Sequence, residues 1–167
     1  MWGFSKDFGL AGFRMGFIHS YNSSLLASID GGSIFTCVPA HMQNVAAGLL
    51  KDSTWLDTVY FPTNMARLNS SYQYAVERLS QLNIKVYPSK GALFVWADFS
   101  HHLSAPTRES EMELFNKLFE EQKLYIVPGS EFGCVQYGWF RLVYAVTRDT
   151  LETALDRITE ALGSSAE

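Results

Sequence analysis

The longest periodic pattern in the chain lies between residues 65 and 82 and predicts a helix with one buried face. Apolar side chains recur there at helical spacing over about five turns. They are Met65, Leu68, Tyr72, Ala75 with Val76, Leu79 and Leu82. A helix of this length with one apolar side has to pack that side against other elements. The pattern therefore requires a layered fold in which this helix covers a sheet or further helices.

Shorter patterns follow this helix and alternate between strand and helix. Strands are predicted at 84–88, 92–99, 124–127 and 139–145, and the letters SKG mark the turn between the first two. Helices are predicted at 109–122 and near 149–162, the second with Leu151, Leu155, Ile158 and Leu162 on one face. Pro128 and Gly129 end the third strand.

Fewer elements are predicted before residue 60. Residues 3–12 read as a turn-rich loop, 13–19 as a short strand, and 38–53 as a helix with Pro39 near its first turn. The letters NSS and DGGS between them are turn signals. The fold class is therefore α/β, with an α+β domain at 63–167. Residues 1–62 hold too few elements to close a sheet, so we expect them to form an incomplete domain that packs poorly by itself.

Composition excludes several function classes. The chain has 167 residues and a formal net charge of −4, and it contains no basic run that would attract a nucleic acid. No apolar stretch approaches the roughly 20 residues of a membrane span. Its two cysteines, Cys37 and Cys134, lie far apart in the sequence, which favours a reducing compartment and a cytoplasmic location.

The segment GFSKDFGLAGFRMG, residues 3–16, carries the most chemistry. It holds Lys6, Arg14 and four glycines. It does not fit a dinucleotide fingerprint, because the glycine spacing differs and no strand precedes it, and it lacks the Lys-Ser/Thr pair of a Walker A loop. A Schiff-base lysine is the alternative, on a tight loop in a partly desolvated pocket, with Ser5 and Arg14 available to a phosphate group. From spacing alone, the alternative that Lys6 and Arg14 are ordinary surface charges is favoured.

This segment resembles the lysine signature of the class I and II pyridoxal-phosphate-dependent aminotransferases. The longer string SKDFGLAGFRMGFIHSYN is similar to the 1-aminocyclopropane-1-carboxylate synthase branch. The resemblance continues in order through VYFPTNMARLNSSYQYAVERL, SKGALFVWADFS and PGSEFGCVQYGWFRLVYA. It implies that residues 1–62 are the tail of the cofactor-binding large domain, and that 63–167 are the small domain.

The resemblance also implies a role for each matched residue. Lys6 would hold pyridoxal 5'-phosphate through a Schiff base and then move protons at the substrate's Cα. Ser5 and Arg14 would bind the cofactor phosphate, and Arg141 would bind the α-carboxylate of an amino acid substrate. For Arg141 an internal ion pair is the structural alternative. The reaction would be transamination, or elimination from S-adenosylmethionine, and full-length members are expected to be homodimers.

Two departures from the family pattern bear on activity. Gly3 stands where many relatives have a serine that contacts the phosphate. Only five residues precede Lys6, whereas the family places most of the large domain there, including the aspartate that keeps the ring nitrogen protonated. We therefore expect a fragment with weak or no turnover alone. The alternative is a non-enzymatic product that folds as a small domain or pairs with a full-length relative. No metal site is expected, and His101 and His102 read as a loop pair.

Overall fold

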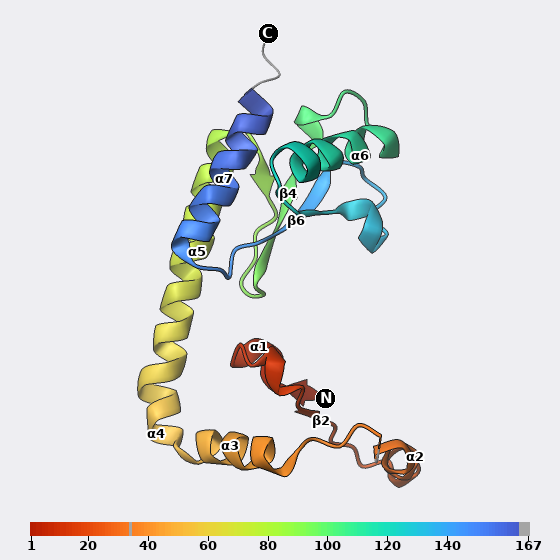
Figure 1. Cartoon of the computed structure of the whole chain (residues 1–167), viewed down its shortest axis with the longest axis vertical. Helices are drawn as coiled ribbons and strands as arrows, with labels where there is room; N and C mark the ends of the chain where they lie inside the picture. Colours follow the sequence, from red (N-terminus) through yellow and green to blue (C-terminus); the bar gives the residue numbers. More distant parts are fainter. Residues whose placement is uncertain (34, 164–167) are drawn as a thin grey trace. The chain divides into compact units, whose positions relative to one another are not determined.

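The computed structural model describes residues 1–33 and 35–163. Within the chain, Met1–Pro62 and Thr63–Glu167 form two compact units, which Figure 1 traces along the sequence colours. Mixed helix and sheet is the predicted fold class, and the elements of the two units confirm it.

The second unit is built on a four-stranded antiparallel sheet. Its strands are β3 (Lys85–Val86), β4 (Phe94–Asp98), β5 (Val127–Pro128) and β6 (Trp139–Val143), in the order β3-β4-β6-β5. Trp96 of β4 lies opposite Arg141 of β6, so these two side chains share one face of the sheet. Val95, Ala97, Phe140 and Leu142 alternate with them on the other face and are buried.

Three helical segments cover the buried face. They are α5 (Phe61–Gln81), α7 (Arg148–Gly163), and α6 (Arg108–Asn116) with the π-helical turn η4 (Lys117–Glu121) that continues it. Leu79, Leu114, Leu118, Leu151, Leu155 and Ile158 join the strand residues in one apolar core. Each such buried side chain stabilises the fold by roughly 1.5–3 kcal/mol. Packing thus dominates over the exposed Arg78–Asp156 ion pair, which links α5 and α7 where they run side by side (Figure 1).

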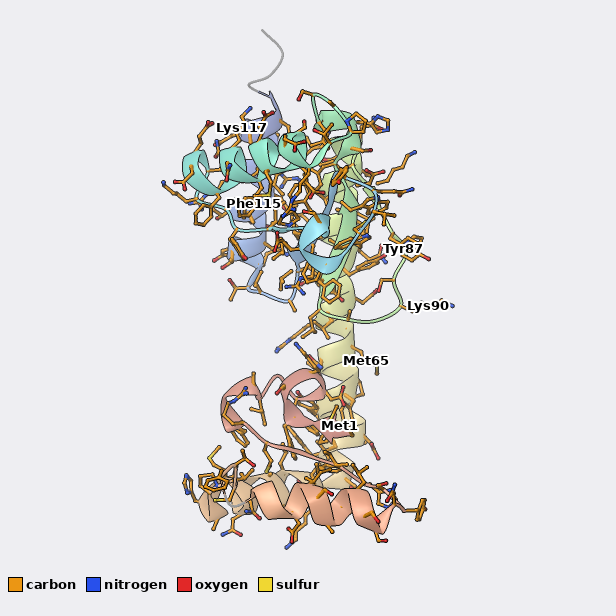
Figure 2. All side chains as sticks on the ribbon, turned by 90° about the vertical axis from the view of Figure 1, so that its right-hand side faces the viewer. Met1, Met65, Tyr87, Lys90, Phe115 and Lys117 are labelled. Atoms are coloured by element: carbon orange, nitrogen blue, oxygen red, sulfur yellow. The ribbon has the colours of Figure 1, made fainter. Side chains whose placement is uncertain are left out.

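The connection between β3 and β4 contains the predicted SKG turn. The Ser89 hydroxyl donates to the Gly91 carbonyl oxygen at 2.6 Å, and the Ser89 N–H donates to the Tyr72 hydroxyl at 3.4 Å. Tyr87 and Lys90 extend outward from this connection (Figure 2). The turn is therefore fastened to α5 through Tyr72, which keeps the start of β4 in register.

The first unit has a smaller core. It contains β1 (Trp2–Gly3), α1 (Phe4–Asp7), the 3-10 turn η1 (Ala11–Phe13), β2 (Gly16–Phe17), α2 (Ser23–Ser33), α3 (Ala40–Lys51), α4 (Ser53–Trp55) and the π-helical turn η2 (Leu56–Tyr60). Its buried hydrophobic residues are Phe4, Phe8, Ala46 and Leu56. By contrast, Tyr21 is 97% exposed and Phe35 is 88% exposed, in keeping with the poor packing expected for these residues.

Strands β1 and β2 pair as a two-stranded antiparallel ribbon. Gly3 lies opposite Gly16. A Cβ placed on Gly16 would come within 2.9 Å of the Trp2 carbonyl oxygen, so only glycine allows the two backbones to approach this closely. The ribbon fixes the loop that carries Ser5 and Lys6 relative to Arg14.

The helices predicted at 38–53, 65–82, 109–122 and 149–162 are confirmed, with shifted ends. Five predictions are wrong in part. The predicted loop at 3–12 contains α1, and the strand predicted at 84–88 is reduced to Lys85–Val86. Residues 23–33 form α2 instead of turns, because the Asn22 side chain accepts from the Leu25 N–H at 3.1 Å and starts a helix. The strand at 13–19 shrinks to Gly16–Phe17, since its partner β1 has only two residues. The strand at 124–127 shrinks to Val127–Pro128, the two residues that pair with β6.

Candidate functional site

Ser5 and Lys6 lie on the single turn α1, which two phenylalanines fix in place. Phe4 and Phe8 are buried on either side of Lys6, 2% and 8% exposed, with their ring centres 5.3 Å apart. The Phe4 N–H donates to the Met15 carbonyl oxygen at 3.2 Å. Gly9 follows with a φ of +64°, a conformation that glycine adopts without strain. The two buried phenylalanines thus fix the backbone of α1, and the side chains of Ser5 and Lys6 between them remain available to a ligand.

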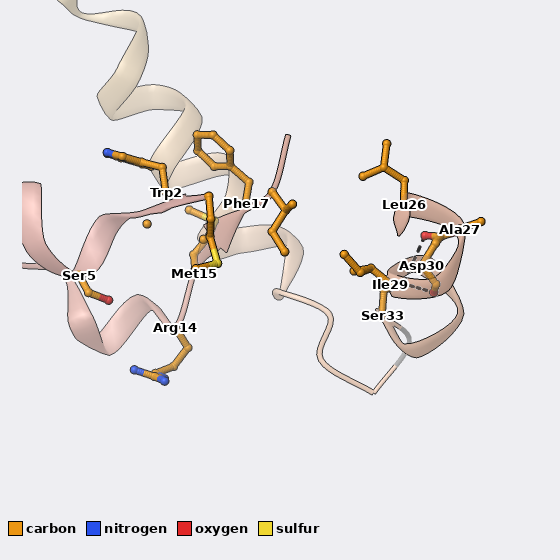
Figure 3. A pocket seen from close by; sticks show the side chains of 14 residues that line it. Trp2, Ser5, Arg14, Met15, Phe17, Leu26, Ala27, Ile29, Asp30 and Ser33 are labelled. Atoms are coloured by element: carbon orange, nitrogen blue, oxygen red, sulfur yellow. Dashed lines mark hydrogen bonds between the residues drawn. The ribbon is translucent and has the colours of Figure 1, made fainter. Parts of the chain in front are cut away.

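Arg14 directly follows the 3-10 turn η1, in the second half of the segment 3–16. Its backbone is left-handed, with a φ of 51°, and its Nη1 donates to the Ala11 carbonyl oxygen at 3.2 Å. Ser5 and Arg14 line the same depression, whose volume is about 960 Å³. Figure 3 shows these two side chains on one side of it and Leu26 and Ile29 of α2 on the other.

The exposure of the Lys6 side chain differs from the Schiff-base prediction. The sequence predicts a partly desolvated lysine, but its side chain is exposed and does not line the depression. Among the described residues it forms no side-chain hydrogen bond or ion pair, while Asp7 beside it accepts from the Trp2 indole. The reason is geometric: one helical turn places Phe4 and Phe8 inward, so Lys6 between them points outward.

The residues of the first unit fit one end of the expected cofactor. A phosphate group needs cationic and hydroxyl donors, and Arg14 and Ser5 present both to one depression. The Arg14 guanidinium engages a neutral carbonyl oxygen, and therefore keeps its charge and most of its donors for an anion. The unpaired Lys6 amine stands beside Ser5 in the chain.

Arg141 lies on β6 in the second unit, on the sheet face opposite the core. Its guanidinium carbon is 4.4 Å from the centre of the Phe132 ring and 5.4 Å from that of Phe94. Its Nε is buried and has no hydrogen-bond partner among the described residues. No described carboxylate lies within ion-pair distance of it. The internal ion pair considered as an alternative is therefore absent from residues 1–33 and 35–163.

An aromatic wall surrounds this arginine. Trp96, directly opposite Arg141, stacks on Trp139 with ring centres 6.0 Å apart and an angle of 11° between the planes. Trp96 also meets the edge of Phe132, with ring centres 6.0 Å apart. These rings partly shield the guanidinium from water, which strengthens its attraction for an anion.

No role in the site was predicted from the sequence for Phe94, Phe132 or Glu111. Glu111 is fully buried and lies at the same helical spacing as Leu114 and Leu118, which are both in the core. An acid at an apolar position of a helix face is a usable signal, because buried carboxyls are rare unless they have partners. Phe132 gave no signal, since only the folded loop brings it to Arg141.

Other polar residues have structural roles. The His102 Nε2 lies 3.0 Å from the Leu82 carbonyl oxygen, and His101 is exposed. Among the described residues no three or more His, Cys, Asp and Glu side chains gather as metal ligands. None of the described helices is long and apolar enough to cross a membrane.

Comparison with known proteins shows clear relatives. The family model described as Aminotransferase class I and II matches residues 1–158. The 1-aminocyclopropane-1-carboxylate synthase-like protein 1 of Takifugu rubripes is 36% identical over 97% of this chain and 26% of its own length. The 1-aminocyclopropane-1-carboxylate synthase 7 of Arabidopsis thaliana is 36% identical over 93% of this chain and 35% of its own. A mouse relative, 34% identical, is described as a probable inactive synthase-like protein.

Solved structures agree on the fold. The aromatic aminotransferase of Pyrococcus horikoshii superposes with a TM-score of 0.80 and 25% identity, over 98% of this chain and 42% of that one. The aspartate aminotransferase of Rhizobium meliloti gives a TM-score of 0.81 at 21% identity, over 96% of this chain and 40% of that one. The chain thus spans roughly a quarter to two fifths of the length of these relatives.

Proposed function

The chain belongs to the class I and II aminotransferases, and we propose that it carries two parts of the active site of a pyridoxal-phosphate-dependent enzyme acting on α-amino acids. The first unit, as the tail of the large domain, contributes Lys6, Ser5 and Arg14 for the cofactor. The second unit, as the small domain, contributes Arg141 for the substrate carboxylate. Because relatives are much longer, turnover by these residues alone is weak or absent.

The unpaired guanidinium of Arg141 carries this proposal. A buried Nε without a partner is costly, and a bidentate carboxylate is the group whose geometry matches a guanidinium. The rings of Phe94 and Phe132 both lie within cation–π distance of the guanidinium. A carboxylate bound here is held in one orientation, which fixes the Cα bonds of an amino acid relative to Arg141.

The cofactor residues have separate tasks. When bound, pyridoxal phosphate supplies the electron sink that stabilises negative charge at the substrate's Cα. Arg14 and Ser5 would hold its phosphate group, and Lys6 would supply the amine that attaches the cofactor and that transfers a proton at the substrate's Cα. Family names favour either transamination or synthase-type elimination, and the mouse relative described as probable inactive is consistent with weak turnover.

Chemical labelling tests the cofactor part. The purified chain is incubated with pyridoxal phosphate, reduced with borohydride and digested, and the label is located by peptide mass. We expect the label on Lys6, its loss in Lys6→Ala, and a marked reduction in Arg14→Gln, which keeps a polar side chain but removes the positive charge. Lys51→Ala, at an exposed lysine on α3, is the matched control and should label normally. Equal labelling of all exposed lysines would contradict the proposal.

A further inference from the structure

A buried carboxyl joins helix α6 to the loop that precedes β6. Glu111 is fully buried. Its Oε1 accepts from the Gly138 N–H at 2.9 Å, and its Oε2 accepts from the Ser130 N–H at 3.4 Å. Ser130 and Gly138 are the two ends of the loop that contains Phe132. One side chain therefore holds both ends of this loop.

The same loop carries the ring that covers Arg141. Phe132 ends the 3-10 turn η5 (Gly129–Phe132), and Gly138 directly precedes β6, on which Arg141 lies. Moving either end would displace Phe132 from the guanidinium or shift the start of β6. The Glu111 carboxyl thus sets the separation between the two groups without touching either of them.

Both ends of the loop are also closely packed. A Cβ on Gly138 would lie 2.7 Å from the Ser100 Cα, and a Cβ on Gly129 would lie 2.9 Å from the Trp139 carbonyl oxygen. The loop ends therefore lie against neighbouring backbone, and the Glu111 oxygens are the side-chain acceptors available to their N–H groups among the described residues.

We propose that Glu111 is a positioning residue for the carboxylate site: by accepting from Ser130 and Gly138 it holds Phe132 over the Arg141 guanidinium. The inference rests on the proposed role of Arg141 and names a residue on which that role depends. Glu111→Gln is the informative change, because an amide keeps the size and one acceptor oxygen but turns a donor toward the second N–H.

The loop offers a matched control. Glu131 lies in the same loop and forms an exposed pair with Arg108 of α6, at 3.8 Å. Glu131→Gln also removes one glutamate that links α6 and the loop, but at the surface, where such pairs contribute little. The two variants differ in whether the carboxyl is buried and bonded to the backbone.

Nuclear magnetic resonance of the Arg141 side chain in the full chain tests the inference. The Phe132 and Phe94 rings displace the Arg141 proton signals, and acetate serves as the carboxylate probe, with chloride at equal ionic strength as the screening control. In Glu111→Gln we expect the ring-induced displacement to shrink and the dissociation constant for acetate to rise by roughly fivefold or more. Glu131→Gln should match the wild type in both.

The possible outcomes distinguish the carboxylate-binding role of Arg141 from the positioning role of Glu111. If acetate leaves the wild-type Arg141 signals unchanged relative to chloride, the carboxylate role itself is overturned. If the wild type responds to acetate and Glu111→Gln binds acetate equally well, with its Arg141 signals at the wild-type positions, only the positioning role is overturned. A loss of thermal stability alone, with normal Arg141 signals, also overturns it.

A second measurement uses the wild-type chain, and it tests the inference even if Glu111→Gln does not fold. In the wild-type chain, amide hydrogen exchange at Ser130 and Gly138 is compared with exchange at Val135 and Gln136, which are exposed in the same loop. If the Ser130 and Gly138 amides exchange at least about tenfold more slowly, the proposed hydrogen bonds to Glu111 are supported. Equal rates at all four amides overturn it.

Discussion

The Arg141 guanidinium lies 4.4 Å from the centre of the Phe132 ring, although the two residues belong to different elements, strand β6 and the turn η5. The contact brings an aromatic face to a cation whose Nε has no hydrogen-bond partner among the described residues. In the second unit, this contact positions the cation that we propose as the binding group for the substrate carboxylate.

Replacing this ring should weaken anion binding by a small, defined amount. Phe132→Leu keeps an apolar side chain but removes the quadrupole that attracts the guanidinium. A cation–π contact at a partly exposed site contributes about 0.5–1 kcal/mol. We therefore expect the dissociation constant for acetate, measured on the Arg141 signals, to rise about two- to fivefold.

Phe119→Leu provides the comparison for that variant. Phe119 stacks on Phe115, with ring centres 5.8 Å apart, and contacts Tyr125, so its loss removes a ring without touching Arg141. Acetate binding should stay at the wild-type level. A Phe132→Leu chain that binds acetate as well as this control does would show that the ring contributes nothing to the site.

Two glycines near the same loop should differ in their tolerance of alanine. Gly133 has a φ of +73° with open space around it, whereas Gly138 has a φ of +95° and the Ser100 Cα would lie 2.7 Å from an added Cβ. Gly133→Ala incurs only the left-handed backbone penalty, about 1–2 kcal/mol. Gly138→Ala incurs that penalty plus a clash with backbone, so its urea midpoint should be clearly the lower. Equal midpoints would mean that the Ser100 backbone moves away freely.

The helix predictions were correct where apolar residues recur at helical spacing over several turns. Helices α5 and α7 each bury residues at helical spacing, such as Ala75 with Leu79, and Leu151 with Leu155 and Ile158. Helix α2 was missed because the glycines in its last turn resemble a turn and it has no buried residue. Its start could have been found, since Asn22 followed by Ser23 is a capping signal and Leu25, Leu26 and Ile29 are spaced for one face.

The candidate site was only partly predictable for a related reason. Arg141 stands in a recognisable motif, but its surroundings depend on contacts across the chain: Phe94 comes from another strand, and Glu111 acts from a helix. Local patterns do not encode such contacts. The role of Lys6 was predicted from its motif. Its exposure follows from the burial of Phe4 and Phe8 and agrees with the surface-charge alternative that spacing alone favoured.

Stability of the second unit should fall at alkaline pH because of Tyr144. Burial, and then the neighbouring Tyr72, raise the pKa of Tyr144 above its ordinary value of 10.0, and its hydroxyl donates to the Ala92 carbonyl oxygen at 2.7 Å. Folding therefore favours the neutral phenol. Its contribution is complete below the unfolded pKa and is lost as pH rises through the raised folded pKa.

The test compares urea midpoints from about pH 8 to about pH 11. The wild type should lose stability steeply at the alkaline end, and Tyr144→Phe should lose less there, although it starts lower by about 1 kcal/mol for the lost hydrogen bond. Tyr87→Phe, at a residue that is 65% exposed, should retain the wild-type alkaline slope. A Tyr144→Phe profile parallel to that of the wild type would exclude Tyr144 as the cause.

Amide hydrogen exchange should separate α2 from α7 in the intact chain. Helix α7 buries Leu151, Leu155 and Ile158 completely, whereas α2 has no buried residue and leaves Leu25 45% exposed. Backbone bonds of a helix open with a free energy set by the packing that opening would disrupt, and isolated helices of this length are marginal in water. We expect α2 amides to exchange at least about a hundredfold faster than α7 amides, which corresponds to roughly 2.7 kcal/mol. Helix α3, with Ala46 buried and Leu49 packed on the core of the first unit, should lie between them. Protection of α2 equal to that of α7 in the purified chain would show that another surface covers its apolar side chains.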